Sequence, residues 1–163
     1  MKVDDALLVT PEREAFLALA CDHDVVPVLA ELTSDTVTPF SVFTRLAAGG
    51  RNPFLLESVE GGERVARYSF VGCDPLRVVE LRDGRALVDG VPSAAPPLEA
   101  LRRATDLGSV APVAGLPPFA GGAVGHLGYD AVRLVERVPD SGRDETGLPQ
   151  GWFGVYDAVV ALD

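Results

Sequence analysis

Residues 54–72 read FLLESVEGGERVARYSFVG and predict two short β-strands joined by a tight turn. Both ends of this stretch, residues 54–58 and 65–73, are rich in the aromatic, β-branched and leucine residues that strands favour. Residues 60–63 between them contain a Gly-Gly pair, and glycine reaches positive φ without steric cost, as tight turns require. We therefore expect an antiparallel hairpin.

Further strands are expected on the C-terminal side of this hairpin. Residues 76–81 and 85–89 flank the turn sequence Asp83-Gly84, which predicts that the centre of the chain is an antiparallel meander. Residues 152–162, WFGVYDAVVAL, read as one long buried strand. Because such a strand needs a neighbour, we expect the sequence to be the front part of a longer polypeptide. We also expect the chain alone to self-associate or to expose an apolar patch along this strand.

Three helices are expected, each opened by a proline. Residues 10–12, Thr-Pro-Glu, place a hydroxyl cap, a proline and an acid at the start of a helix that runs to about Cys21. The same Thr-Pro start at residues 38–39 leads into apolar residues at helical spacing, and a Gly-Gly pair ends that helix. Residues 96–103, PPLEALRR, open the third helix.

The fold class that these elements predict is α+β, an antiparallel β-sheet packed with a few α-helices in one domain spanning residues 1–163. A hydrophobic content of 47 % is enough to bury a core. Residues 25–28, VVPV, contain a proline and are expected to form an edge strand or an extended connection.

The charge balance excludes two classes of partner. The 14 Lys and Arg residues are outnumbered by 24 Asp and Glu residues, which gives a net charge of -10. The resulting field repels phosphate backbones and anionic lipids, so we expect no nucleic-acid and no membrane partner. No apolar run approaches the roughly 20 residues of a membrane span, and the N-terminus has no basic stretch followed by an apolar one. We expect a soluble cytoplasmic protein.

The cysteines and the first histidine do not have the spacing of a metal site. Cys21 and Cys73 belong to no CxxC pair, and we expect two small buried thiols, with a disulfide as the alternative. Residues 21–24, Cys-Asp-His-Asp, offer ligand atoms, but consecutive side chains point in different directions. We therefore interpret them as a polar helix terminus and predict no metal.

Residues 121–130, GGAVGHLGYD, bring His126 close to a tyrosine and an aspartate. The segment has neither the GK[ST] ending nor the GxGxxG spacing of phosphate-binding loops. We expect these glycines to let a strand pass close to another backbone or to a helix. No nucleophile elbow is present either, so we predict no catalytic residue in this chain.

The end of the first expected strand, residues 55–58, combines apolar and polar groups. Side chains alternate along a strand, so Leu56 and Ser58 share one face while Leu55 and Glu57 share the other. A free amino acid needs a hydrogen-bond donor, an acceptor and an apolar slot, and this sequence supplies all three. The pattern also describes an ordinary end of an edge strand, and both readings stay open at this point.

Four segments together resemble a known family. They are the VPV sequence around Pro27, TPFSVFTRL at residues 38–46, the stretch 54–72, and LPPFAGGAVGHLGYD at residues 116–130. Their order and spacing resemble the N-terminal domain of anthranilate synthase component I, a chorismate-utilising enzyme. The resemblance covers residues 13–163.

The resemblance implies a place in tryptophan biosynthesis. The parent enzyme of this family converts chorismate and ammonia to anthranilate and pyruvate, with Mg²⁺ at its active site and a glutamine amidotransferase subunit that supplies ammonia. The family's catalytic machinery lies in a C-terminal chorismate-binding domain. The resemblance therefore implies that this chain is non-catalytic, carries no cofactor, and senses L-tryptophan as a feedback effector.

The resemblance also implies which residues hold the effector. The family's serine of the LLES motif corresponds to Ser58, and the tryptophan site would include Leu56, Glu57 and Ser58. A secondary lining is expected from the segment that precedes the second strand, at Arg67, Tyr68 and Ser69. The other half of the pocket, a Pro-Tyr-Met type segment, belongs to the C-terminal domain.

One departure and several competing families qualify the match. His126 stands where relatives have the first tyrosine of Gly-Tyr-Leu-Gly-Tyr-Asp. The N-terminal domain of aminodeoxychorismate synthase component I, in the para-aminobenzoate branch, is similar but more often has aspartate in place of Glu57. Salicylate and isochorismate synthases are more distant, and a stand-alone small-molecule-binding or protein-interaction domain is the remaining alternative.

Overall fold

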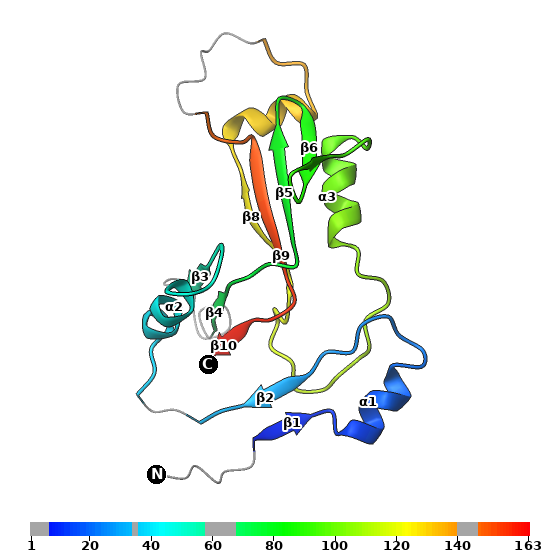
Figure 1. Ribbon diagram of the computed structural model, residues 1–163, viewed down its shortest axis with the longest axis vertical. Helices are drawn as coiled ribbons and strands as arrows, with labels where there is room; N and C mark the ends of the chain where they lie inside the picture. The colour runs from blue at the N-terminus through cyan, green and yellow to red at the C-terminus, as the bar shows by residue number, and fades with distance from the viewer. Residues whose placement is uncertain (1–6, 34–35, 58–67, 140–146) are drawn as a thin grey trace.

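The computed structural model of the protein describes residues 7–33, 36–57, 68–139 and 147–163 (Figure 1). The described strands are β1 Leu8–Thr10, β2 Leu29–Glu31, β3 Phe54–Glu57, β4 Ser69–Gly72, β5 Arg77–Arg82, β6 Arg85–Val88, β7 Val91–Pro92, β8 Gly122–Leu127, β9 Gly151–Tyr156 and β10 Val160–Leu162. The described helices are α1 Arg13–Leu19, α2 Pro39–Ala47, α3 Pro97–Thr105 and the 3-10 helix η1 Tyr129–Leu134. No helix among these residues is long and apolar enough to cross a membrane.

The strands form three antiparallel sheets. One has two strands in the order β1-β2, one has three in the order β10-β4-β3, and one has five in the order β7-β6-β5-β9-β8. Helix α2 packs against β3 and β4, and α3 packs against β5 and β6 (Figure 1). The predicted α+β class, with antiparallel sheets and a few helices, is confirmed.

The predicted central meander is wrong in one respect, because β4 and β5 belong to different sheets. The predicted long strand over residues 152–162 divides in the same way, with β9 inside the five-stranded sheet and β10 at an edge of the three-stranded one. A run of β-branched and aromatic residues indicates that the backbone is extended, but it does not indicate which strands pair with it. Here the chain bends at Asp157, and the residues on either side of the bend pair with different strands. Of the two strands in this run, only β10 has an edge without a neighbouring strand among the described residues, so the expected apolar patch is restricted to β10.

The two larger sheets are joined where β9 ends. Tyr156 is 1 % exposed, and its hydroxyl donates a hydrogen bond to the carbonyl oxygen of Asn52 over 2.7 Å. Its ring meets the ring of Phe54 edge-on, with 4.7 Å between the centroids. Phe54 in turn lies over Gly72, where a Cβ atom would overlap the ring. The last residue of β9 is thereby fixed to the start of β3 and the end of β4.

The largest buried cluster lies between the five-stranded sheet and α3. Val79, Leu81 and Ala86 are fully buried in the sheet, and they pack against two alanines of the helix, Ala100 and Ala104. The small alanine side chains let α3 approach the sheet closely. On the exposed side of the helix Glu99 accepts hydrogen bonds from Arg102 and Arg103, and these hold its pKa at about 2. The third predicted helix is confirmed.

Helix α2 is confirmed, and its predicted threonine cap is present. The Thr38 side chain accepts a hydrogen bond from the amide of Ser41, and the Ser41 hydroxyl accepts one from the amide of Thr38. The cap predicted for the first helix is wrong, because Thr10 lies in β1, where it pairs with Leu29, and α1 begins at Arg13 without a side-chain cap. The pairing of Thr10 with Leu29 in the β1-β2 sheet therefore takes precedence over the helix start that the local sequence predicts.

The segment 25–28 is the predicted extended connection. Val25 makes an isolated parallel bridge to Val110, and the strand that follows begins at Leu29. The prediction of two buried thiols is wrong for Cys21, which is exposed at the end of α1, a helix without a buried residue. Cys73 is half-buried, and this burial raises the pKa of its thiol. Both thiols are free.

The predicted role of the glycines in residues 121–130 is confirmed at Gly125 on β8. A Cβ atom there would overlap the backbone of Trp152 and Phe153 on β9. We expect Gly125→Ala to destabilise the protein by about 1–3 kcal/mol or more, because neither strand backbone can yield. Gly49→Ala is the matched control, since no atom lies within 4 Å of its Cβ position. Urea unfolding measures both, and a Gly125→Ala variant as stable as the control would contradict the close approach.

Replacing Tyr156 by Phe tests the junction between the sheets. At neutral pH the loss of the hydrogen bond to Asn52 is expected to lower the free energy of unfolding by about 0.5–1.5 kcal/mol. Burial, followed by the charge of Cys73, raises the pKa of Tyr156 above its usual value. The unfolded chain therefore loses this proton first, so stability falls as the pH rises above about 10.

The Phe variant has no such proton and should show a flatter stability profile in urea titrations across the alkaline range. An identical alkaline decline in both proteins would show that Tyr156 does not carry the effect.

Candidate functional site

The described residues among those predicted to bind an effector lie where β3 ends and β4 begins. Glu57 is the last residue of β3 and pairs with Ser69, the first residue of β4, while Leu56 pairs with Phe70. Two of the predicted site residues, Ser58 and Arg67, lie outside the described residues, as does the predicted turn at 60–63. The described residues thus place the hairpin partners of this motif side by side.

The described site residues divide between the two faces of this sheet. Residues directly opposite each other in an antiparallel pair share a face, so Leu56 lies with Phe70. Tyr68 stacks on Phe70, with ring centroids 6.0 Å apart and planes at 24°, and joins the same face. Glu57 and Ser69 form a pair on the opposite face.

A continuous row of aromatic rings covers the face that carries Leu56. From the end of β3 at Glu57 toward its start at Phe54, the row contains Tyr68, Phe70, Phe119, Phe54 and Tyr156. Phe70 and Phe119 meet edge-on at 5.5 Å, and Phe119 and Phe54 at 6.4 Å. The sequence analysis missed this row. The alternation of Tyr68 and Phe70 is a local signal for its first two rings, but Phe119 comes from a distant loop.

At the outer end of this aromatic row Tyr68 is half-buried, whereas Leu56 is 45 % exposed and Glu57, on the opposite face, is also exposed. A ligand that joins an apolar or aromatic group to a cation can pack on the face of Leu56 and reach the Glu57 carboxylate around the end of the strand. An amino acid with a large apolar side chain has this combination.

The acidic cluster at residues 21–24 forms the predicted polar helix terminus. The Cys21 thiol donates to the carbonyl of Leu17, and His23 Nδ1 lies 3.0 Å from the carbonyl oxygen of Leu19. Asp24 accepts hydrogen bonds from the amide and the hydroxyl of Ser109, which lower the pKa of its carboxyl group. Within the described parts of the chain, no three His, Cys, Asp or Glu side chains come together as a metal site.

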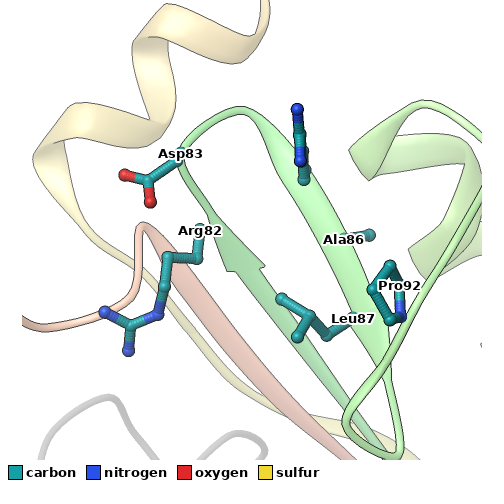
Figure 2. Close-up of a pocket in the computed structure, with 6 residues that line it drawn as sticks. Arg82, Asp83, Ala86, Leu87 and Pro92 are labelled. Carbon is teal, nitrogen blue, oxygen red and sulfur yellow. The ribbon is translucent and has the colours of Figure 1, made fainter.

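Two grooves lie elsewhere on the surface. One of about 390 Å³ lies at the junction of the sheets, and its lining includes Asn52, Phe54, His126, Trp152 and Tyr156. The other, of about 460 Å³, lies on the β5–β6 hairpin and is lined by Arg82, Asp83, Arg85, Ala86, Leu87 and Pro92 (Figure 2). Neither is lined by a predicted effector residue.

Arg82 lines the hairpin groove, but its guanidinium group is already engaged in hydrogen bonds within the protein. Figure 2 shows this side chain pointing away from Ala86 and Pro92. It donates to Glu80 over 2.7 Å and to the carbonyl of Gly147 over 2.8 Å. These contacts tie the hairpin to the segment before β9.

Comparison with curated proteins finds anthranilate synthase component 1 among the relatives of this chain. The chain is 40 % identical to anthranilate synthase component 1 of Mycolicibacterium smegmatis, over 97 % of this chain and 31 % of the relative. It is 42 % identical to the protein of the same name from Streptomyces coelicolor, over 97 % of this chain and 28 % of the relative. The chain thus spans about 30 % of the length of these relatives. No protein-family model matches the sequence.

Comparison with solved structures agrees with this result. The crystal structure of anthranilate synthase component I from Streptococcus pneumoniae TIGR4 superposes with a TM-score of 0.54 at 26 % sequence identity. The match covers 83 % of this chain and 29 % of the solved chain. Sequence and fold therefore indicate the same family, and the resemblance found in the four sequence segments is confirmed.

Proposed function

We propose that this chain, which is homologous over nearly its whole length to the N-terminal region of anthranilate synthase component I, is the tryptophan-sensing part of such an enzyme. On this proposal it is non-catalytic and works in the cytoplasm as a feedback regulator of tryptophan biosynthesis. The observation that carries the proposal is the Glu57–Ser69 end of the β3–β4 pair, where the aromatic row meets the exposed Leu56.

The chemistry of this end suits L-tryptophan. An indole ring can pack on the apolar face at Leu56 and Tyr68, because ring stacking and apolar burial both favour such contact. The Glu57 carboxylate lies on the opposite face at the last position of β3, so on this proposal the ligand's ammonium group reaches it around the end of the strand. Ser58, the next residue, supplies a hydroxyl that can hydrogen-bond the ligand.

The reaction itself belongs to the rest of the enzyme on this proposal. The C-terminal chorismate-binding domain would convert chorismate to anthranilate and pyruvate, with ammonia from a glutamine amidotransferase subunit. Among the described residues no three acidic or other metal-binding side chains come together. We assign the Mg²⁺ of the parent enzyme to the remainder of the enzyme, and no cofactor to this chain.

Feedback inhibition requires that the effector bind one state of the enzyme better than another. The aromatic row runs from Tyr68 at the proposed site to Tyr156, where β9 meets β3. A ligand held at the outer end therefore packs against a contiguous set of rings that reaches the junction between the two larger sheets. A change at the effector site is expected to alter inhibition without altering the chemistry of a remote active site.

A substitution at Ser58 tests the proposal. The test protein is a full-length fusion in which this chain replaces the matching 31 % of the M. smegmatis relative. We expect Ser58→Leu to weaken tryptophan inhibition roughly tenfold to a hundredfold, because it removes a hydrogen bond of about 1–3 kcal/mol and fills the slot. Turnover without tryptophan should remain that of the parent fusion. The measurement is a tryptophan titration of anthranilate formation, followed by fluorescence.

Ser58→Ala is the matched variant, since it removes the hydroxyl without adding bulk. It should show part of the effect of Ser58→Leu. Unchanged inhibition and unchanged turnover in both variants would mean that Ser58 is a solvated hydroxyl at a strand end and would overturn the assignment.

A further inference from the structure

The two-stranded sheet β1-β2 has one face made entirely of aliphatic residues. Val9 and Ala30 are paired and therefore share a face. Alternation along each strand places the neighbouring residues two positions away on the same side. We call this the outer ribbon face, and its members are Leu7, Val9, Val28, Ala30 and Leu32.

Both faces of the ribbon carry exposed residues, and they differ in composition, because the opposite face includes Thr10 and Glu31 beside Leu29 and Leu8, of which Leu8 is 64 % exposed. Leu29, on the opposite face, is half-buried and lies against Gly115 in the loop before β8. On the outer ribbon face Val9 is 41 % exposed, Val28 56 % and Leu32 81 %. Figure 1 shows β1 and β2 side by side at one end of the molecule.

A solvent-facing side of an antiparallel ribbon is normally polar, and this one has no polar member. Across the described residues 7–33 and 36–50 no side chain is fully buried, although several are aliphatic. A two-stranded sheet is also only marginally stable by itself. A contiguous apolar patch on such an element marks a surface that another protein surface covers.

The length of the relatives and the net charge of this chain indicate what covers the outer ribbon face. The homologous proteins are about three times as long as this chain, since it spans 28–31 % of them. A second copy of the chain would bring another net charge of -10 against the first, which opposes close association. A domain within the same longer polypeptide is tethered at high effective concentration.

We infer that the outer ribbon face docks against an apolar surface of the component I polypeptide that lies beyond this chain's share of it. This inference rests on the proposed function, because it takes the chain as one part of that enzyme. It adds the surface through which the sensing part holds its catalytic partner. That surface lies on β1 and β2, apart from the effector site on β3 and β4.

Cysteine labelling tests whether the face is covered. Val9→Cys and Ala30→Cys place a thiol on the outer ribbon face, and Glu31→Cys places one on the opposite face of β2 as the matched control. Each variant is made in this chain alone and in the full-length fusion with the M. smegmatis relative. Iodoacetamide labelling is followed by mass spectrometry of the labelled peptides, which separates these thiols from the exposed Cys21.

We expect the thiols at positions 9 and 30 to react at least about tenfold more slowly in the fusion than in the chain alone, with little change at position 31. Cooperative thermal unfolding shows that the fusion is folded. If the thiol at position 30 is then labelled at the same rate in the fusion as in the chain alone, the inference is overturned. Slow labelling in the chain alone that recovers on dilution would identify a second copy as the occupant and overturn it too. A second fusion with the S. coelicolor relative repeats the comparison if the first does not fold.

Tryptophan titration of the same fusions keeps this test separate from the proposed function. Protected thiols with no tryptophan response would leave the docking surface standing and remove the sensing role. Free thiols with normal tryptophan inhibition would do the reverse.

Discussion

The contact between Tyr156 and Phe54 is the constraint on which the arrangement of the larger sheets depends. It joins the end of β9 in the five-stranded sheet to the start of β3 in the three-stranded sheet, through an edge-on ring contact and the hydrogen bond to Asn52. Both polypeptide segments that cross between the sheets, before β5 and after β9, pass close to this point. The buried side chain of Tyr156 therefore holds the two larger sheets in their relative position.

The same constraint determines where the proposed site lies. Because the start of β3 is held at Phe54, its other end extends away from the core and leaves Leu56 and Glu57 exposed. The aromatic row continues from the junction to that end through Phe119 and Phe70. Rigid packing at one end and exposure at the other suit a regulatory ligand, since binding at the open end acts on an already ordered surface.

Local signals in the sequence predicted the individual helices and strands well. They failed where the structure depends on which distant strand a segment pairs with. The Thr-Pro start of α2 and the Asp83-Gly84 turn are local and were correct. The division of residues 152–162 between two sheets depends on distant strands, so no pattern within the run contains it. At the site, alternation predicted the face of Leu56, whereas Phe119 reaches that face from a loop far along the chain.

A crystal structure of the full-length fusion with L-tryptophan is the most direct test of the proposed effector site. We expect ligand density at the end of β3, with the indole ring on the face of Leu56 and Tyr68 and the ammonium group near Glu57. Density in another place, such as the groove at the junction that includes His126 and Trp152, would contradict it. So would a site that stays empty at a tryptophan concentration that inhibits the enzyme fully.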